Sequence, residues 1–395
     1  MEFKELKKCM DKLVCEYNTP GVDVMVYKEH ELIYRYFAGM SDIENGKKTN
    51  GTELYLIFSM TKMLTCTGAL QLFEKGKYNM NDPLYKYLPE FKNMKVSFQN
   101  HNSENAKKVT QGIAVADAET KNSIGYAKNP ITIKNLFTMC AGFNYDLGAD
   151  YFKTALKNSK TTTAELVSTM SNAVLEFEPG TRFNYSLCHD VLGALIEVWS
   201  GKKFGDYMRE NVFEPIGMKN TFFGIPKDKE LLDRMAMRYC FDENKKPYSM
   251  PLECMYNLSS EYESGGAGLT SCTEDYALFL DALANKGVAK NGNIILKPET
   301  VELMGTNQLS GKPLEDFNEL RNGYGYGLGV RTHIDKEKSG SLSPLGEFGW
   351  DGAAGAFSMV DTKNRLSLTY FQHIHNWDLN IQSEIRNSLY TDLNL

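Results

Sequence analysis

The sequence predicts an α+β fold: an antiparallel sheet flanked by helices, joined to an inserted all-helical lobe. Runs with strand character occur near both ends of the chain, at 22–39 and again from 325 to 372. Helical patterns and loops dominate between them, from about residue 60 to 240. Strands at both ends favour one sheet that both halves of the chain complete. The expected division is a sheet lobe of residues 1–75 and 250–395 and a helical lobe of residues 76–249.

The first elements are expected to be a helix and a hairpin. Apolar residues recur at helical spacing near the N-terminus, at Phe3, Leu6, Met10, Leu13 and Val14. VDVMVYK (22–28) and ELIYRYFAG (31–39) then have the character of strands, and the polar pair Glu29-His30 joins them. We expect a turn at this pair.

The remaining strands are expected late in the chain. They are GYGLGVRTHI (325–334), AGAFSMVD (354–361) and RLSLTYFQ (365–372), and the tail after them has a helical pattern. The glycine-rich run at 323–329 lacks the helix that a phosphate loop must open into, so we interpret it as the turn before a strand. The polar stretch 94–129 interrupts the helical lobe and is interpreted as a long surface loop or hairpin.

Composition excludes several classes of function. The 395 residues carry a net charge of −6 without a basic block, which argues against nucleic-acid binding. No window approaches the roughly 18 uncharged apolar residues of a membrane span. The N-terminus also lacks the apolar core of a secretory signal. The eight cysteines form no Cys-x-x-Cys pair and are expected to be reduced core thiols of a cytoplasmic protein.

We expect no metal and no cofactor. His373-Ile-His375 has the alternation of a strand, which would place both imidazole rings on one face. No acidic or cysteine ligand is placed near them, so two exposed histidines are expected instead of a metal site.

Two Ser-x-x-Lys patterns compete as a nucleophile with its base. About two such matches are expected by chance, so the spacing alone carries little weight. Ser200 precedes Gly201 and so lies in a C-terminal helix turn, the wrong end of a helix for developing negative charge. Ser59, in IFSMTK (57–62), opens a buried helix that Gly76 stops, and the positive end of the helix dipole favours negative charge there.

Lys62 shares a helix face with Ser59, three residues apart. Its neighbours are apolar, so its ammonium would be poorly solvated and its pKa should fall, which would let the neutral amine act as a base. The alternative is that Lys62 extends to water and Ser59 only caps the helix. Local sequence leaves these two interpretations open.

Five blocks in order decide the matter through a resemblance. They are IFSMTKMLTCTGALQLFEKGK, NPITIKNLFTMCAGF, FEPGTRFNYSLCHDVLGALIEVWSGKKFGDYMRENVFEPIGMKNT, SGGAGLTSCTEDYALFLDAL and FGWDGAAGAFSMVD. Together, from about residue 20 to 375, the chain resembles the penicillin-recognising serine hydrolases. The branch it resembles most is the class C β-lactamase-like one, which includes family VIII carboxylesterases. The resemblance implies a β-lactamase/transpeptidase-like fold and one catalytic unit, with the active site between the lobes.

The same resemblance implies the roles of the site residues. Ser59 would be the acylated nucleophile and Lys62 part of its base. Tyr185, in Asn-Tyr-Ser-Leu (184–187), takes the place of the family's tyrosine, and we expect a tyrosinate stabilised by the Lys62 ammonium. The third motif is Trp350-Asp351-Gly352. The N–H groups of Ala353 and Ser59 would then form the oxyanion hole.

Two departures from the lactamase pattern bear on the substrate. Leu187 stands where lactamases carry an amide-binding Asn, and Trp350 stands where they carry the Lys that attracts a carboxylate. Asp351, if it faces the cleft, would repel a carboxylate. The esterase branch commonly carries such motifs. We therefore expect a carboxylesterase acting on small uncharged acyl esters, with weak or absent β-lactamase activity.

Other functions on the same site remain open at this stage. An acyltransferase would use the same chemistry with another acceptor. A D-amino-acid peptidase or β-lactamase is a further variant, and Asp351 could then pair with an amino group. A non-catalytic ligand-binding protein is the alternative of another class. The expected partner is a small acyl substrate, with no nucleic acid and no membrane. The oligomeric state, and whether 94–129 covers the cleft, are undetermined.

Overall fold

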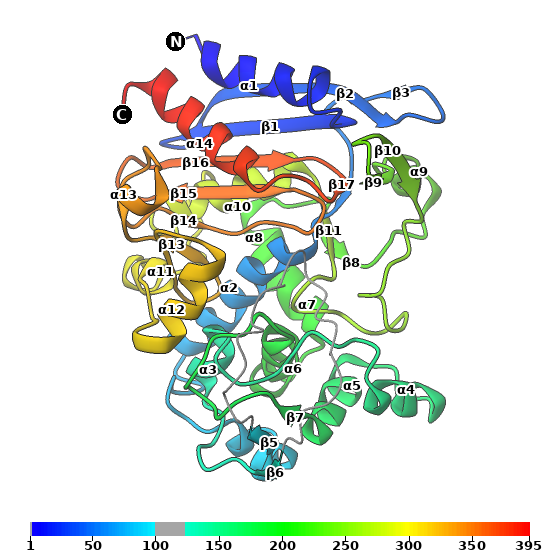
Figure 1. The fold of residues 1–395 in the computed structure, drawn as a ribbon, viewed down its shortest axis with the longest axis vertical. Coiled ribbons are helices and arrows are strands. Elements are labelled where there is room, and N and C mark those ends of the chain that lie inside the picture. The colour runs from blue at the N-terminus through cyan, green and yellow to red at the C-terminus, as the bar shows by residue number, and fades with distance from the viewer. Residues whose placement is uncertain (1, 99–122) are drawn as a thin grey trace.

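An eight-stranded antiparallel sheet forms the upper half of the molecule (Figure 1). The structure is a computed structural model and describes residues 2–98 and 123–395. The strand order is β12-β13-β14-β15-β16-β1-β2-β3, so the first strands of the chain lie beside the last. The bounds are β1 Gly21–Lys28, β2 Glu31–Asp42, β3 Lys47–Lys48, β12 Tyr324–Tyr326, β13 Arg331–His333, β14 Phe348–Gly349, β15 Phe357–Asp361 and β16 Leu366–Phe371. The predicted fold class is confirmed.

The β1–β2 hairpin turns at the predicted pair. Glu29 and His30 both have positive φ, 53° and 69°, as the central residues of a type I′ turn require. His30 Nδ1 lies 2.8 Å from Asp281 Oδ2, which ties the turn to the rest of the protein. Because type I′ turns match the twist of paired strands, the hairpin continues directly into the sheet.

Helices from the two ends of the chain cover one face of the sheet (Figure 1). They are α1 (Lys4–Cys15) and α14 (Asn380–Leu393), both as predicted. Leu13 and Leu389 pack with Val24 and Leu368 of the central strands in one apolar cluster. This cluster joins the first and last segments of the chain, so the sheet is complete only when both are in place.

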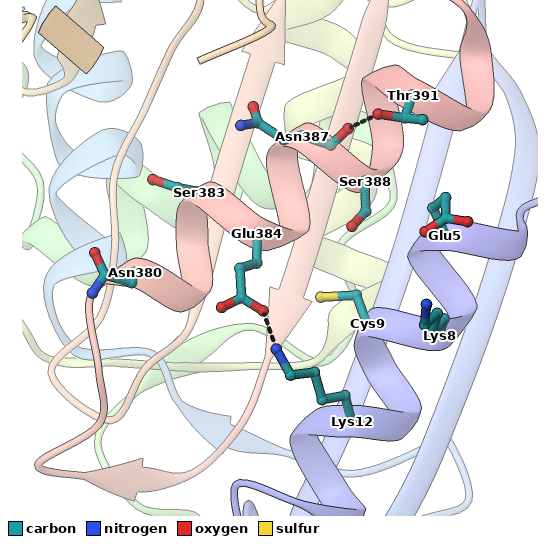
Figure 2. A pocket seen from close by; sticks show the side chains of 10 residues that line it. All are labelled: Glu5, Lys8, Cys9, Lys12, Asn380, Ser383, Glu384, Asn387, Ser388 and Thr391. Carbon is teal, nitrogen blue, oxygen red and sulfur yellow. Dashed lines mark hydrogen bonds and ion pairs between the residues drawn. The ribbon is translucent and has the colours of Figure 1, made fainter. Parts of the chain in front are cut away.

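A groove of about 480 Å³, lined mostly by residues with polar side chains, runs between these two helices (Figure 2). Lys12 of α1 and Glu384 of α14 form an ion pair of 3.2 Å across it. The groove lies on the face of the sheet turned away from the helical lobe. It is therefore separate from the region of Ser59.

The other face of the sheet contacts α10 and, beyond it, the helical lobe. Met25 and Tyr27 of β1 pack against Ala277 of α10 (Thr273–Ala284). Below it lie α2 (Thr61–Glu74) and α6 (Cys188–Ser200), both largely buried (Figure 1). The other helices are α3 Ile133–Phe137, α4 Asp150–Lys157, α5 Thr163–Thr169, α7 Phe204–Met208, α8 Glu214–Ile216, α9 Lys229–Asp233, α11 Pro298–Gly305, α12 Gly311–Leu320 and α13 Lys336–Ser339.

Three small sheets complete the described part of the chain. They are β4-β11-β8, β9 with β10 and β17, and β5 with β6 and β7. Their bounds are β4 Tyr55–Leu56, β5 Lys95–Phe98, β6 Ser123–Tyr126, β7 Val174–Leu175, β8 Phe222–Phe223, β9 Arg238–Phe241, β10 Pro247–Met250, β11 Leu269–Ser271 and β17 Ile374–His375. The β5–β6 pair is antiparallel, which agrees with a hairpin in the 94–129 stretch. Its residues 99–122, and with them the question whether it covers the cleft, lie outside the described residues.

Three expectations differ from the structure. Segment 325–334 is not one strand, because β12 and β13 form a hairpin around its glycines, and part of the glycine-rich run is itself β12. The helical lobe does not extend to residue 249, because β8 and β9 pair with β11 and β17. His373 is buried and its Nδ1 lies 2.8 Å from Ala236 O, while His375 is partly buried, so the prediction of two exposed histidines was wrong.

All eight cysteines are free thiols, and most of them are buried. Among the residues that the structure describes, no group of histidines, cysteines and carboxylates is arranged to hold a metal ion. Across the same residues, no helix combines the length and the hydropathy of a membrane span.

The terminal-helix cluster generates a stability prediction. Leu389 is 0% exposed, and Leu389→Ala should lower the free energy of unfolding by about 2–5 kcal/mol through lost apolar burial and the cavity left behind. Urea unfolding followed by circular dichroism measures this. Leu395→Ala is the control, since that side chain is 48% exposed and its loss should cost below about 0.5 kcal/mol. Equal effects of both changes would contradict the proposed role of the cluster.

Candidate active site

Ser59 lies on a 3-10 turn, Phe58–Met60, directly before α2. The turn is anchored on both sides: Ile57 N–H donates to Leu269 O (3.0 Å), and Tyr276 O–H donates to Met60 O (2.9 Å). Phe58 and Met60 are buried, whereas Ser59 is partly exposed. The fold therefore presents this hydroxyl at the positive end of a buried helix, as predicted.

The residue before the serine has an unusual backbone. Phe58 has a φ of 45°, a region that bulky side chains avoid. Its ring packs edge-on against Tyr256 (5.7 Å between centroids) and His375 (5.4 Å). Such a conformation persists only where packing holds it, and it occurs often at functional sites.

The Lys62 side chain is fully buried and reaches the serine. Lys62 Nζ lies 3.4 Å from Ser59 Oγ, 3.3 Å from Tyr145 OH and 2.7 Å from Gly266 O. Burial lowers the pKa of Lys62 to about 7, and the negative charge of Asp190 partly opposes this shift. The alternative in which Lys62 extends to water is wrong, because its exposure is 0%.

The three hydrogen-bonding neighbours of Lys62 Nζ define the orientation of a neutral amine. Such an amine has two N–H donors and one lone pair. Gly266 O can only accept a hydrogen bond, and Tyr145 OH can accept the second. The lone pair is then left for the proton of Ser59 Oγ, which is the geometry a general base needs.

Tyr185, which precedes α6, lies beside both groups. Its phenol oxygen accepts a hydrogen bond from Trp350 Nε1 (3.2 Å), and the neighbouring Ser59 and Trp350 side chains partly oppose the rise in its pKa. Lys62 Nζ lies 4.6 Å from the centre of the Tyr185 ring. Burial raises the pKa of Tyr185 above its usual value of 10.0, so the expected tyrosinate was wrong for this structure. The phenol keeps its proton and can donate it.

The 350–353 segment approaches the chain just before Ser59. A Cβ on Gly352 would lie 2.7 Å from Ile57 O, so a glycine is needed for this approach. Gly352 N–H donates to Ala356 O (2.8 Å), which closes the turn. Ala353 is partly exposed, while Trp350 is buried. The structure thus brings this motif together with Ser59, Lys62 and Tyr185.

Two of the predicted site residues are placed differently from expectation. Asp351 is paired with Arg321, with Arg321 Nη2 2.7 Å from Asp351 Oδ2, so it does not present a free negative charge. Leu187 is 1% exposed and packs in the main apolar core, which makes it a core residue next to Tyr185. The free Asp351 carboxylate that was expected to repel a substrate carboxylate is therefore not present.

Sequence reasoning missed four residues around the site: Tyr145, Asp190, Gly266 and Arg321. Tyr145 is one of 22 tyrosines, and Arg321 lies 30 residues before its partner, so neither carried a local signal. Gly266 falls in SGGAGL, where repeated glycines indicated a close approach. Asp190 stands among apolar residues of α6, and a carboxylate in such a helix was a usable signal.

The second Ser-x-x-Lys pattern has a structural role. Ser200 ends α6, Gly201 follows with a φ of 71°, and Ser200 Oγ accepts a hydrogen bond from Lys202 N–H (3.1 Å). Ser200 therefore helps to close a helix C-terminus, as predicted.

Comparisons with known proteins agree with the fold. The Beta-lactamase family model matches residues 6–385. Protein Rv1367c of Mycobacterium tuberculosis is 27% identical over 368 residues, which cover 89% of this chain and 86% of that protein. Esterase EstB of Burkholderia gladioli is 25% identical over 391 residues, 92% of this chain and 88% of that one. Among solved structures, EstCE1, a hydrolase with promiscuous acyltransferase activity, superposes with a TM-score of 0.78 at 22% identity, covering 98% of both chains.

The burial of Lys62 predicts a pH dependence for Ser59. Below pH 7 the amine is mostly protonated and cannot accept the serine proton, so the rate at which a fluorophosphonate labels Ser59 should rise with pH and level off above about 8. Mass spectrometry of protein quenched at timed intervals measures this rate. A rate that is flat between pH 5 and 9, after correction for reagent hydrolysis, would contradict a neutral-lysine base.

Proposed function

Because the chain belongs to the beta-lactamase family, we propose that it is a serine hydrolase that forms an acyl-enzyme through Ser59. The proposed activity is that of a carboxylesterase on small uncharged acyl esters. The observation that carries the proposal is the fully buried Lys62 amine, 3.4 Å from Ser59 Oγ. An amine whose pKa is near 7 is partly neutral at neutral pH, so next to a hydroxyl it can remove the hydroxyl proton.

Acylation follows from these positions. Ser59 Oγ attacks the ester carbonyl carbon while its proton moves to Lys62 Nζ. The carbonyl oxygen becomes an oxyanion, for which the N–H groups of Ser59 and Ala353 are the proposed donors. When the intermediate collapses, the C–O bond to the leaving alcohol breaks and Tyr185 O–H supplies its proton. The proton held by Lys62 then restores the Tyr185 phenol.

Deacylation repeats the sequence with water. Water attacks the acyl carbon, its proton passes to the Tyr185–Lys62 pair, and Ser59 Oγ leaves and is reprotonated. Trp350 Nε1 donates to the Tyr185 oxygen, so the phenol hydrogen is directed to another acceptor. This arrangement supports Tyr185 as a proton donor during both halves of the reaction.

The surroundings of Ser59 favour an uncharged substrate. Aromatic rings stack in a row from Tyr145 to Tyr185 and Trp350, with centroids 5.6 Å apart at each step. Arg321, a cation close to the motif, is already paired with Asp351. A substrate carboxylate, such as that of a penicillin or a peptide C-terminus, would have to break this ion pair to bind Arg321. A simple ester would leave the ion pair intact. The relative EstB, itself named an esterase, supports the same class.

Acyl transfer to an alcohol is the second candidate. The aromatic row suits an organic acceptor as well as an acyl group, and the similar structure EstCE1 is described as a hydrolase with acyltransferase activity. The two reactions share the acyl-enzyme and differ only in whether water or an alcohol attacks it. Product analysis with added short alcohols separates them.

The substrate prediction is tested with two chromogenic substrates. Short p-nitrophenyl esters should be turned over with a kcat/KM at least about 100-fold above that of a chromogenic cephalosporin, because only the cephalosporin brings a carboxylate to the Arg321–Asp351 pair. Faster cephalosporin turnover would overturn the esterase assignment. Ser59→Ala should abolish both reactions and fluorophosphonate labelling. Labelling at another residue, or none at all in the unmodified protein, would instead favour a non-catalytic ligand-binding protein.

Tyr185→Phe tests the proton donor. The change removes the hydroxyl and keeps the ring in its stack, so kcat for esters should fall by about 10²–10⁴-fold while the circular dichroism spectrum is unchanged. Tyr248→Phe is the matched control, since that side chain is 50% exposed and lies on β10. Retention of kcat in Tyr185→Phe would remove Tyr185 from the mechanism.

A further inference from the structure

Asp190 is a fully buried carboxylate in the first turn of α6, which the proposed mechanism does not use. One of its oxygens, Oδ1, accepts hydrogen bonds from Tyr262 O–H (2.7 Å) and Ser264 O–H (2.6 Å). The backbone N–H of Gly266 also points to Oδ1, at 3.5 Å. This oxygen therefore fixes the start and the end of segment 262–266 at one point.

The other oxygen of Asp190 is placed differently. Oδ2 is buried and has no hydrogen-bond partner among the described residues. Burial of a carboxylate oxygen without a hydrogen-bond partner costs folding free energy. Its presence indicates either a compensating positive charge or a functional role. The neighbouring titratable group is Lys62, whose pKa is lowered by burial, and the negative charge of Asp190 partly opposes this shift.

Gly266 shows how Asp190 and Lys62 face each other. A Cβ on Gly266 would lie 2.7 Å from Asp190 Oδ2, 3.3 Å from Lys62 Nζ and 3.2 Å from Tyr145 OH. The three polar atoms thus surround a space that only a glycine leaves open. The carbonyl of the same glycine accepts the 2.7 Å hydrogen bond from Lys62 Nζ.

We propose that Asp190 is a positioning residue for the reaction at Ser59: its buried carboxylate holds segment 262–266 so that Gly266 O orients the Lys62 amine, and its second oxygen faces that amine. The inference rests on the proposed function, because it assigns Asp190 to the same base. Asp190 acts through Lys62 and does not contact the substrate. It keeps the lone pair of the neutral amine directed at Ser59.

The charge of Asp190 has a second effect on the same base. Burial alone would push the pKa of Lys62 lower still, and a carboxylate nearby favours the ammonium. An amine with a higher pKa is a stronger base for the serine proton, provided that part of it remains neutral. The titratable groups around Lys62 come from several elements. They are Asp190, Cys188 and His189 at the start of α6, Cys66 of α2, Asp351 next to Trp350, and the rings of Tyr145 and Tyr185.

The test replaces the carboxylate by its neutral isostere. In Asp190→Asn the Lys62 ammonium loses its stabilising charge, so the midpoint of the pH–kcat/KM profile for a p-nitrophenyl ester should move to lower pH by about 1 unit. The kcat at the plateau should fall by about 10- to 100-fold, because the amine is a weaker and less well oriented base. The KM should change by less than about threefold, since Asp190 is buried away from the substrate.

Asp281→Asn is the matched control. Asp281 is also fully buried, but it pairs with His30 and Asn285 at the hairpin end of the protein. The same chemical change there should leave the pH midpoint and kcat unchanged. An Asp190→Asn enzyme with the pH midpoint and kcat of the unmodified protein would overturn the inference, as would an equal midpoint shift in Asp281→Asn.

A second variant covers the case in which Asp190→Asn does not fold. Tyr262→Phe keeps the charge and removes one of the two hydroxyl donors to Oδ1, so kcat should fall by about 3- to 10-fold without a shift of the midpoint to lower pH. An unchanged kcat would overturn the positioning role. The proposed function is judged separately, by fluorophosphonate labelling of Ser59 in the unmodified protein. Absence of that labelling overturns both proposals, whereas labelling together with an inert Asp190→Asn change overturns the role of Asp190 alone.

Discussion

The burial of one amine is the constraint on which the rest of the site depends. Lys62 is 0% exposed, and its pKa falls from 10.5 to about 7, which corresponds to roughly 5 kcal/mol of preference against the charged form. A folded protein tolerates this only if the surrounding structure supplies the partners that water would supply. Gly266 O, Tyr145 OH and Ser59 Oγ supply them. The amine is thus kept both desolvated and hydrogen-bonded, the state in which it can accept a proton near neutral pH.

The architecture brings these partners from distant parts of the chain. The sheet, completed by both chain ends, positions the 350–353 segment, and Gly352 allows it to approach Ile57 just before the serine. Helix α6 brings Asp190 from the helical lobe, and the segment just before it brings Tyr185. Buried ion pairs of Arg331 and Arg386 with Glu347 join α14 to the sheet. Since the removal of one partner would leave a buried charge, this network makes the rigid support of the site sensitive to single substitutions.

Charge pairing and aromatic packing together describe the proposed substrate. The guanidinium of Arg321, which contacts the 350–353 segment, is neutralised by Asp351. The stacked rings of Tyr145, Tyr185 and Trp350 give the surroundings an apolar character with hydroxyl and indole donors at the edges. These surroundings are the basis for proposing an acyl group without charge and a poor fit for a carboxylate. Trp350 stands where lactamases carry the lysine that attracts a carboxylate, and the next residue, Asp351, is paired with Arg321.

The sequence by itself determined the elements and the identity of the central residues. The periodicity of the terminal helices, the Glu29-His30 turn and the five ordered blocks predicted the fold class and the group of Ser59, Lys62 and Tyr185 that the structure brings together. Tertiary structure alone decided the protonation state of Tyr185 and the charge partners. Tyr185 keeps its proton, Asp351 is paired with Arg321, and Asp190 faces Lys62 across Gly266. The physical reason is that pKa values and ion pairs depend on burial and on neighbours distant in the chain, whereas periodicity and turn chemistry are local properties.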